Sequence, residues 1–372
     1  MNKKILHIVT ELFPPDETST AYILGEMANA AAHEYDVHVI CGPEIYDTRK
    51  KIDDKNPFKL DERIKLTRVQ SLGVDKNTKL GKAWAFLTMS LKLYSIAKSK
   101  IKEGDKVLMV TNPAPLVLLI SRLRKKRAFN LNILVHDVFP ENTASAGLHL
   151  PSSVYKLLKR WYDRAYACAD KLLALGRDMA SILRQKTQSS IPIAIVENWA
   201  DVDNVHPLPF PDGKIKLQYA GNIGRVQGLE SLMENLPKDI ELHFYGTGSI
   251  EKTLRAKGQT NVYFHGPYFR SQQTSVIGSA HVSVVTLDKG MYGLGVPSKT
   301  YNIMAAGRPV LYFGPEDGEI GLLIKEHKIG YIGWPREWDV NELATMGKKA
   351  RLVAEQMYSK EFILDKFLKA LR

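Results

Sequence analysis

The sequence is poor in several features that define particular classes of protein. It has only two cysteines, Cys41 and Cys168, which provide neither a disulfide framework nor a metal-ligand spacing and fit a reducing compartment. It has no uninterrupted run of about eighteen apolar residues, so no membrane-spanning helix is expected. Its basic start is followed by an apolar run that is too short and mixed for a signal peptide, and we interpret that run as a first buried strand.

The composition is typical of a globular protein with more than one domain. Hydrophobic residues make up 44% and charged residues 25% of the 372 positions, a length that favours two domains of average size. The formal net charge of +12 indicates an anionic partner. Nucleic acid, anionic lipid and phosphorylated small molecules are the candidates. Nucleic acid is the least favoured, because no nucleic-acid-binding motif accompanies the charge.

Runs of β-branched residues alternate with helical patterns along the chain, which predicts an α/β protein with parallel sheets. The predicted strands of the first half are 4–10, 36–41, 106–111, 132–137 and 171–176. Segments 20–33, 79–100 and 152–169 have helical patterns. The alternation of strand and helix patterns is interrupted at 196–214, which we interpret as a hinge or linker. It resumes with predicted strands at 215–221, 240–246, 262–266, 281–287, 309–313 and 330–334. The architecture expected is two successive doubly wound halves.

The segment GLGVPSKTYNIMAAGRPV combines a glycine-rich turn, a helix start and an abrupt helix stop. In doubly wound sheets ligands bind beyond the carboxyl ends of the strands, often at the start of the next helix. We expect Pro297 at the first helical position, with the amides of Ser298 and Lys299 and the Lys299 ammonium favouring a phosphate. Asn302 lies one turn further, within reach of a sugar hydroxyl. The alternative is a structural helix packed through residues 304–306.

These segments resemble, in order and spacing, the family 4 glycosyltransferases of the branch that builds bacterial capsule and O-antigen polysaccharides. The resembling segments are 11–40, 136–147, 196–203, 219–234, 244–255 and 293–311. The resemblance implies a GT-B fold, in which two Rossmann-like domains face a cleft. It also implies an acceptor-binding domain at 1–197, a nucleotide-sugar-binding domain at 198–340, and C-terminal helices at 341–372 that return to the first domain.

The resemblance places a donor, with a UDP-sugar favoured, mainly on the second domain. The donor-binding residues that it implies are Thr18, Asn222, Arg225, Gly246, Gly295, Val296, Pro297, Ser298, Lys299 and Asn302. Thr18 can instead cap the helix that follows it. No metal or other cofactor is expected, because a helix start and cations can balance the diphosphate. The Asp-Val-Asp at 201–203 resembles a metal motif of another glycosyltransferase class, but its position in the linker predicts a solvated turn.

Two departures from the family pattern bear on mechanism. The family's paired glutamates correspond here to Leu294 and Asn302. Asn302 can still bond a ribose, whereas Leu294 cannot act as acid, base or nucleophile, so a covalent mechanism through that position is excluded. The family's basic pair corresponds to Asn222 and Gln227, which leaves Arg225 and Lys299 as the cations for the diphosphate.

His136 and Asp137 end a predicted strand, where a doubly wound fold places its site. The resemblance implies that His136 contacts the donor sugar and that Asp137 or Glu141 faces the acceptor hydroxyl as part of the catalytic set. The alternative is that the His-Asp pair is a structural hydrogen bond or a helix cap.

The surplus positive charge gathers in the first domain. Residues 122–127 hold five cations, and the segment 79–100 is basic and amphipathic. In 152–169 one helical face is predicted to hold Val154, Leu157, Leu158, Trp161 and Ala165. The remainder of that helix holds Lys156, Lys159, Arg160 and Arg164. Ordinary helices with a packed apolar face are one interpretation. The mixture of Trp and Tyr with cations favours an anionic membrane surface instead, and with it a polyprenyl-diphosphate-linked saccharide acceptor.

The function predicted is metal-independent transfer of a sugar from a nucleotide-diphospho-sugar to that lipid-linked acceptor, in the cytoplasm at the inner face of the plasma membrane. Retention of configuration follows from the resemblance alone. Two alternatives stay open. A GT-B nucleotide-sugar epimerase would need a carboxylate that the Leu294 position does not supply, and a non-catalytic nucleotide-sugar-binding subunit would explain the loss of both glutamates.

Overall fold

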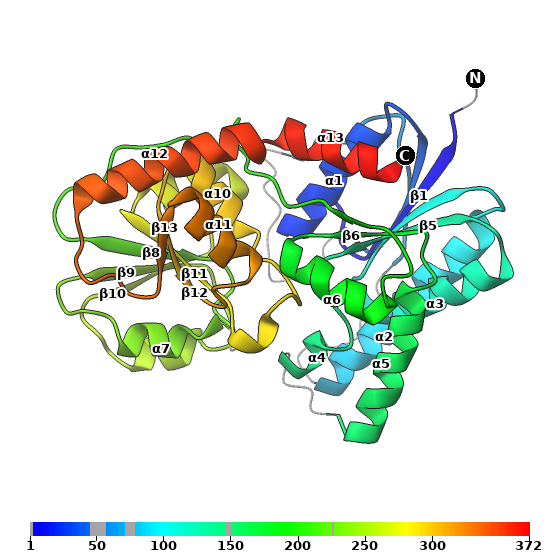
Figure 1. Ribbon diagram of the computed structural model, residues 1–372, viewed down its shortest axis with the longest axis horizontal. Helices are drawn as coiled ribbons and strands as arrows, with labels where there is room; N and C mark the ends of the chain where they lie inside the picture. The colour runs from blue at the N-terminus through cyan, green and yellow to red at the C-terminus, as the bar shows by residue number, and fades with distance from the viewer. Residues whose placement is uncertain (1–2, 45–56, 71–78, 146–149, 225–226) are drawn as a thin grey trace. The chain divides into compact units, whose positions relative to one another are not determined.

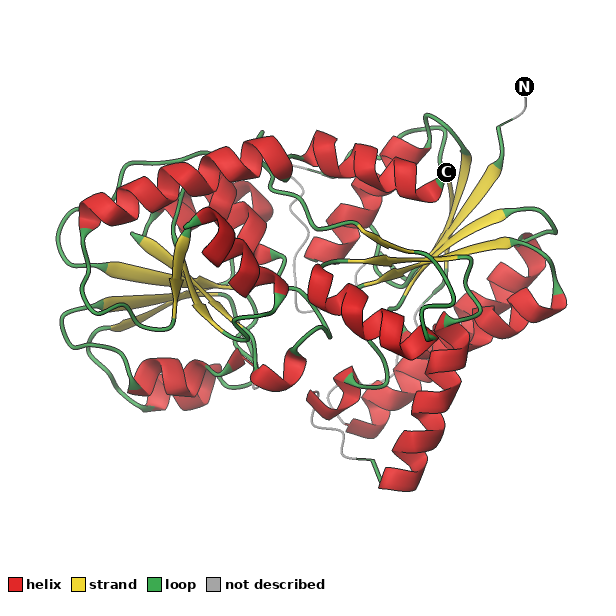
Figure 2. Ribbon diagram, in the orientation of Figure 1, coloured by secondary structure: helices red, strands yellow, loops and turns green. Residues whose placement is uncertain are grey.

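The computed structural model describes residues 3–44, 57–70, 79–145, 150–224 and 227–372. The chain divides into two compact units. The first unit comprises Met1–Val196 with Leu364–Arg372, and the second comprises Glu197–Ile363. Each unit has its own parallel sheet with helices on its faces (Figures 1 and 2). The predicted fold class, two Rossmann-like units, is confirmed.

The first unit is built on a seven-stranded sheet of order β3-β2-β1-β4-β5-β6-β7. Its strands are β1 (Ile5–Val9), β2 (Asp36–Cys41), β3 (Lys65–Arg68), β4 (Lys106–Val110), β5 (Asn130–Val135), β6 (Lys171–Ala174) and β7 (Ile193–Ile195). The central strands β1, β4 and β5 are buried along almost their whole length, because helices cover both faces of the sheet. The two edge strands, β3 and β7, were not predicted, because neither is long or apolar enough to stand out.

Among the described residues, six helices accompany this sheet before the chain leaves the unit. They are α1 (Ser19–Ala31), α2 (Lys79–Lys100), α3 (Ala114–Lys126), α4 (Asn142–Ser145), α5 (Ser152–Tyr166) and α6 (Arg177–Thr187). α3 packs against both α2 and α5. In Figure 1, α2, α3 and α5 lie on the opposite side of the sheet from α13 (Lys360–Leu371), whereas α1 lies on the same side as α13.

The second unit has a six-stranded sheet of order β10-β9-β8-β11-β12-β13. Its strands are β8 (Lys216–Ala220), β9 (Glu241–Tyr245), β10 (Val262–Gly266), β11 (Val282–Thr286), β12 (Val310–Phe313) and β13 (Gly330–Ile332). Its helices are α7 (Leu229–Glu234), α8 (Glu251–Ala256), α9 (Gln273–Gly278), α10 (Lys299–Ala305), α11 (Glu319–His327) and α12 (Val340–Met357), with 3-10 turns η2 (Arg270–Gln272) and η3 (Lys289–Met291). α7 lies on one side of the sheet and α10 and α12 on the other (Figure 1). All six strands lie where the sequence predicts them.

The chain returns to the first unit later than predicted. The sequence prediction assigned 341–372 to the return, but α12 packs on α10 within the second unit, and only Leu364–Arg372 belong to the first. A Cβ on Gly347 of α12 would lie 2.3 Å from the Gly307 carbonyl oxygen, so the two backbones are in contact. The end of α13 is held in the first unit by Lys106 and Lys171, whose ammonium groups donate to the last carbonyls of that helix.

Candidate functional site

Two glycine loops meet at the carboxyl ends of β8 and β9. Gly221 and Gly246 have φ angles of 141° and 128°, a region that favours glycine. A Cβ on Gly246 would lie 2.0 Å from the Gly221 carbonyl oxygen, and one on Gly248 would lie 2.1 Å from the Ile223 carbonyl oxygen. The loops are therefore packed backbone against backbone at these glycines, at the edge where doubly wound sheets bind ligands. The predicted donor residue Gly246 lies here.

Lys299 brings a cation to this edge. Its Nζ atom lies 3.7 Å from the centroid of the Tyr219 ring, and 3.0 Å from the point that a Cβ on Gly221 would occupy. The residue is half-buried, and burial of the amine lowers its pKa to about 7. No carboxylate among the described residues forms an ion pair with it. An amine held in this way is a candidate for binding an anion that arrives from solution.

The start of α10 differs from the prediction in one respect. The helix begins at Lys299 with Ser298 as its N-cap, so Pro297 precedes the helix instead of occupying its first position. The Pro297 carbonyl oxygen accepts a hydrogen bond from the Thr300 amide at 3.2 Å. Gly295 and Val296 belong to the connecting segment and have no regular secondary structure.

Asn302 makes two contacts within the second unit. Its side-chain oxygen accepts a hydrogen bond from the Asp201 amide at 3.0 Å, and its side-chain nitrogen donates to Gln273 Oε1 at 3.1 Å. The amide therefore ties α10 to the segment that enters the unit. Asp201 itself is only 2% exposed, and its carboxylate accepts from Asn204 at 2.8 Å, so the predicted solvated turn is wrong.

Two further donor residues of the sequence prediction follow β8. Asn222 comes directly after Gly221, and its carbonyl oxygen accepts a hydrogen bond from the Tyr219 hydroxyl at 2.9 Å. Arg225 lies outside the described residues.

In the first unit, His136 and Asp137 follow β5 directly. Both backbone amides donate to the Thr111 hydroxyl, at 3.1 and 3.2 Å, which fixes the turn at the end of the strand. The Nε2 atom of His136 is buried without a hydrogen-bond partner among the described residues, and burial lowers the pKa of His136 to about 4, so the imidazole is neutral at pH 7. Burial also raises the pKa of Asp137 to about 6, against the opposing effect of a 2.8 Å hydrogen bond from Asn142.

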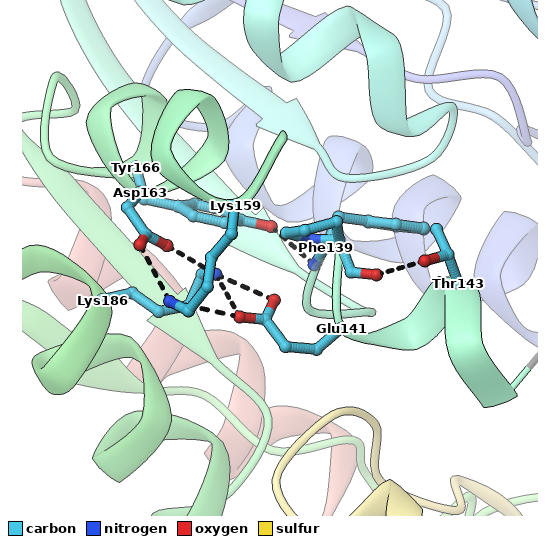
Figure 3. A network of polar contacts seen from close by, with 8 residues as sticks. Phe139, Glu141, Thr143, Lys159, Asp163, Tyr166 and Lys186 are labelled. Carbon is cyan, nitrogen blue, oxygen red and sulfur yellow. Dashed lines mark hydrogen bonds and ion pairs between the residues drawn. The ribbon is translucent and has the colours of Figure 1, made fainter. Parts of the chain in front are cut away.

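Glu141 lies five residues from His136 but is bound in a network of charges (Figure 3). Both of its carboxylate oxygens accept hydrogen bonds from Lys186, at 2.7 and 2.8 Å, and Lys159 lies 3.5 Å away. The Lys186 side chain is 2% exposed and also contacts Asp163 at 2.6 Å. The network ties the loop after β5 to α5 and α6. These contacts indicate a structural role for Glu141, and they leave Asp137 as the better candidate for proton transfer.

Thr18 has the helix-capping role that the sequence left open. Its hydroxyl oxygen accepts a hydrogen bond from the Ala21 amide at 3.2 Å as the N-cap of α1. A residue that the sequence analysis did not single out is Glu11, which follows β1 and is 4% exposed. Its backbone bonds to Gly42 and Asn112, at the ends of β2 and β4. An acidic residue directly after a predicted strand was the available signal for it.

No described part of the chain contains a helix that is both long and apolar enough to cross a membrane. The described residues also contain no group of three or more His, Cys, Asp or Glu side chains arranged to hold a metal ion.

The sequence was compared with family models and with known proteins. No protein-family model matches it. It is 30% identical over 99% of its length to the probable glycosyltransferase WbjE of Pseudomonas aeruginosa, of which it covers 97%. It is 25% identical over 55% of its length to the putative colanic acid biosynthesis glycosyl transferase WcaI of Escherichia coli, of which it covers 57%.

The fold was compared with solved structures. Sucrose-phosphate synthase of Thermosynechococcus elongatus matches with a TM-score of 0.74 and 14% identity, over 99% of this chain and 98% of that one. Anabaena Alr3699/HepE in complex with UDP matches with a TM-score of 0.66 and 12% identity, over 99% of each chain.

Two Rossmann-like units, each with its own parallel sheet, have the fold of the GT-B class. The near full-length match to WbjE is more particular, and it shows that the chain belongs to the GT-B glycosyltransferases. The protein is therefore a glycosyltransferase, as the sequence resemblance implied.

Proposed function

We propose that this glycosyltransferase uses a nucleotide-diphospho-sugar, preferably a UDP-sugar, and binds its diphosphate at Lys299. The observation that carries the proposal is the half-buried Lys299 amine, which has no described carboxylate partner and lies beside the side-chain-free Gly221. An unpaired buried cation is costly unless a ligand compensates it. A diphosphate would do so, and the UDP in the related HepE structure supports this choice of nucleotide. No resident metal is part of the proposal, because protein cations and amides would balance the leaving group.

We further propose that the reaction belongs to cell-surface polysaccharide synthesis, as in the capsule and O-antigen branch of family 4. The acceptor would be a polyprenyl-diphosphate-linked saccharide, used at the inner face of the plasma membrane by a peripherally bound enzyme. The relative named for colanic acid biosynthesis supports the polysaccharide assignment. The net charge of +12 supports an anionic lipid environment.

For the chemical step we propose that Asp137 accepts the proton of the attacking hydroxyl while neutral His136 bonds the donor sugar. A carboxylate with a pKa of about 6 is ionised at neutral pH and is a stronger base than an ordinary Asp. The Nε2 atom of His136 has no hydrogen-bond partner among the described residues, and a bond to a sugar hydroxyl would satisfy it. The attacking oxygen would form its bond to the anomeric carbon on the face from which UDP departs, as the bond between that carbon and the diphosphate breaks, so the configuration of the transferred sugar is retained, as the family 4 resemblance implies.

The test is binding and turnover with the purified protein. Calorimetry should show that Lys299→Ala raises the dissociation constant for UDP about tenfold or more, the scale expected for the loss of a charged hydrogen bond. Incubation of UDP-sugars with lipid-linked acceptors should release UDP and extend the lipid-linked saccharide. Epimerised donor without UDP release would instead identify an epimerase. UDP binding without any turnover across the donor panel would identify a non-catalytic subunit.

A further inference from the structure

The exposed face of α5 is apolar and cationic at once. Val154, Leu157 and Trp161 are 43%, 45% and 42% exposed, and their spacing places them along one side of the helix. The sequence prediction put these residues with Leu158 and Ala165 on one face. The structure separates them, because the core contact of α5 is made by Tyr162, Ala165 and Tyr166. The apolar row is therefore additional to the packing that holds the helix in place.

Cations are interleaved with this row. Lys156, Arg160 and Arg164 are all exposed, and none forms an ion pair with a carboxylate among the described residues. Lys159, by contrast, turns inward to Asp163 and Glu141. The outward surface of α5 thus carries three apolar and three cationic side chains and no exposed carboxylate.

A second apolar row lies on α2. Trp84, Leu87 and Leu91 are 59%, 43% and 47% exposed at the same spacing as the row on α5. Because α3 packs against both helices, α2 and α5 belong to one side of the first unit. We call the six apolar side chains of the two helices the apolar rows.

The run of cations at 122–127 is less suited to docking than its charge suggests. Arg124 pairs with the Asp170 carboxylate at 3.2 Å, and Arg127 donates to the carbonyl oxygens of Lys98 and Ile101 at the end of α2. Two of its five cations therefore hold α2, α3 and the sheet together. The exposed side chains of α5 and α2 described above make no such internal contacts among the described residues.

We propose that the apolar rows insert into the headgroup region of an anionic phospholipid bilayer, while Lys156, Arg160 and Arg164 bind its phosphates. The inference rests on the proposed function, because a lipid-linked acceptor requires an enzyme at the bilayer. The interleaving of cations with Trp and Leu favours lipid over a protein partner. The centre of a protein interface is depleted of charge, whereas a helix lying in a bilayer surface carries both kinds of side chain.

The experiment is sedimentation of the full chain with vesicles of phosphatidylglycerol and phosphatidylcholine, and with vesicles of phosphatidylcholine alone. Binding is expected to the anionic vesicles, together with a blue shift of tryptophan fluorescence as Trp84 and Trp161 leave water. The double variant Leu157→Ser/Trp161→Ser should lower the vesicle partition coefficient about tenfold or more. The double variant Arg160→Gln/Arg164→Gln should lower the vesicle partition coefficient about fivefold for each cation removed at low salt. At high salt it should change that coefficient little.

The matched control is Leu352→Ser, which removes a leucine that is 53% exposed on α12 of the second unit. It should leave vesicle binding unchanged. Equal vesicle binding by the wild type and both α5 variants would overturn the proposal. So would a self-associating wild type that Leu157→Ser/Trp161→Ser converts to a monomer, because the rows would then be a protein interface. UDP affinity, measured on the same samples, tests the proposed function separately. The α5 variants should keep it, whereas a wild type that binds vesicles but no UDP would refute only the donor proposal.

Discussion

The Lys299 ammonium stands 3.7 Å from the centre of the Tyr219 ring, above Gly221 and at the carboxyl end of β8. A cation on an aromatic face gains some electrostatic stabilisation, but burial outweighs it and lowers the pKa of the amine to about 7. In the absence of ligand, the fold therefore carries a group that would be more stable in water. Such a cost is typical of a binding site and not of a packing residue.

The first prediction is that Lys299→Met raises stability while it lowers nucleotide affinity. The folded-state pKa of about 7 lies below the unfolded value of about 10.4, so the unfavourable burial is complete below pH 7 and disappears above about pH 10.5. Thermal unfolding should show a higher midpoint for the variant at pH 6 and no gain at pH 10.5. Calorimetry at pH 7 should show UDP binding weakened by about 1–3 kcal/mol. A variant that is less stable at pH 6 would mean that the amine is a structural group.

The second prediction concerns the pH dependence of UDP binding. The amine must be protonated to bind a diphosphate, so affinity should fall as the pH rises from about 7 toward 10. Lys299→Arg is the matched control, because a guanidinium stays protonated throughout this range. Titrations from pH 7.5 to 9.5 should show a falling affinity in the wild type and a flat one in the Arg variant. Parallel curves for the two proteins would assign the pH dependence to another group.

The sequence was sufficient to predict the long buried strands and the loops that follow them. β2 runs over the predicted residues 36–41, and α2 over 79–100, because continuous apolar runs and helical periodicity are properties of the chain itself. It was also sufficient to place Gly246 at a strand end and Lys299 at a helix start, since doubly wound topology follows each strand with a loop and a helix.

Contacts between residues that are far apart in the sequence could not be predicted. Nothing in the sequence indicates that the Glu141 carboxylate meets Lys186, or that the Asn302 side chain binds the Asp201 amide, because each contact depends on tertiary packing. The buried Arg308 is a similar case. Its guanidinium donates to the carbonyl oxygens of Leu208, Pro209 and Gly278, so a basic residue after a helix stop proves to hold the linker.

The third prediction separates Asp137 from Glu141. Glu141→Gln removes a carboxylate that offsets the buried Lys186 ammonium, so it should lower the free energy of unfolding by about 1–3 kcal/mol. Asp137→Asn should instead abolish most transfer activity. The folded-state pKa of Asp137, about 6, lies above the unfolded value of about 3.9, so its carboxylate opposes folding above pH 6 and has no such effect below about pH 4. The Asn variant should therefore be at least as stable as the wild type at pH 8.

The measurements for this pair are urea unfolding at pH 8 and transfer rates across pH 5–8. The kcat/KM of the wild type should rise with pH through about 6 as Asp137 ionises, and Glu141→Gln should keep that profile despite its lower stability. If Glu141→Gln lost the pH dependence while Asp137→Asn kept it, the two roles would be reversed.

The fourth prediction concerns Asn302, for which the sequence resemblance implied a ribose contact. Its side-chain oxygen accepts from the Asp201 amide and its nitrogen donates to Gln273, so Asn302→Ala removes two hydrogen bonds inside the second unit. We expect a loss of about 1–3 kcal/mol in the free energy of unfolding, because the buried Asp201 amide is left without its partner. UDP affinity should fall by only about 0.5–1.5 kcal/mol if the same oxygen also bonds the ribose. The discriminating ligand is 2′-deoxy-UDP. A ribose contact predicts that the variant loses its preference for UDP over the deoxynucleotide, whereas a purely structural Asn302 predicts an unchanged ratio between the two ligands.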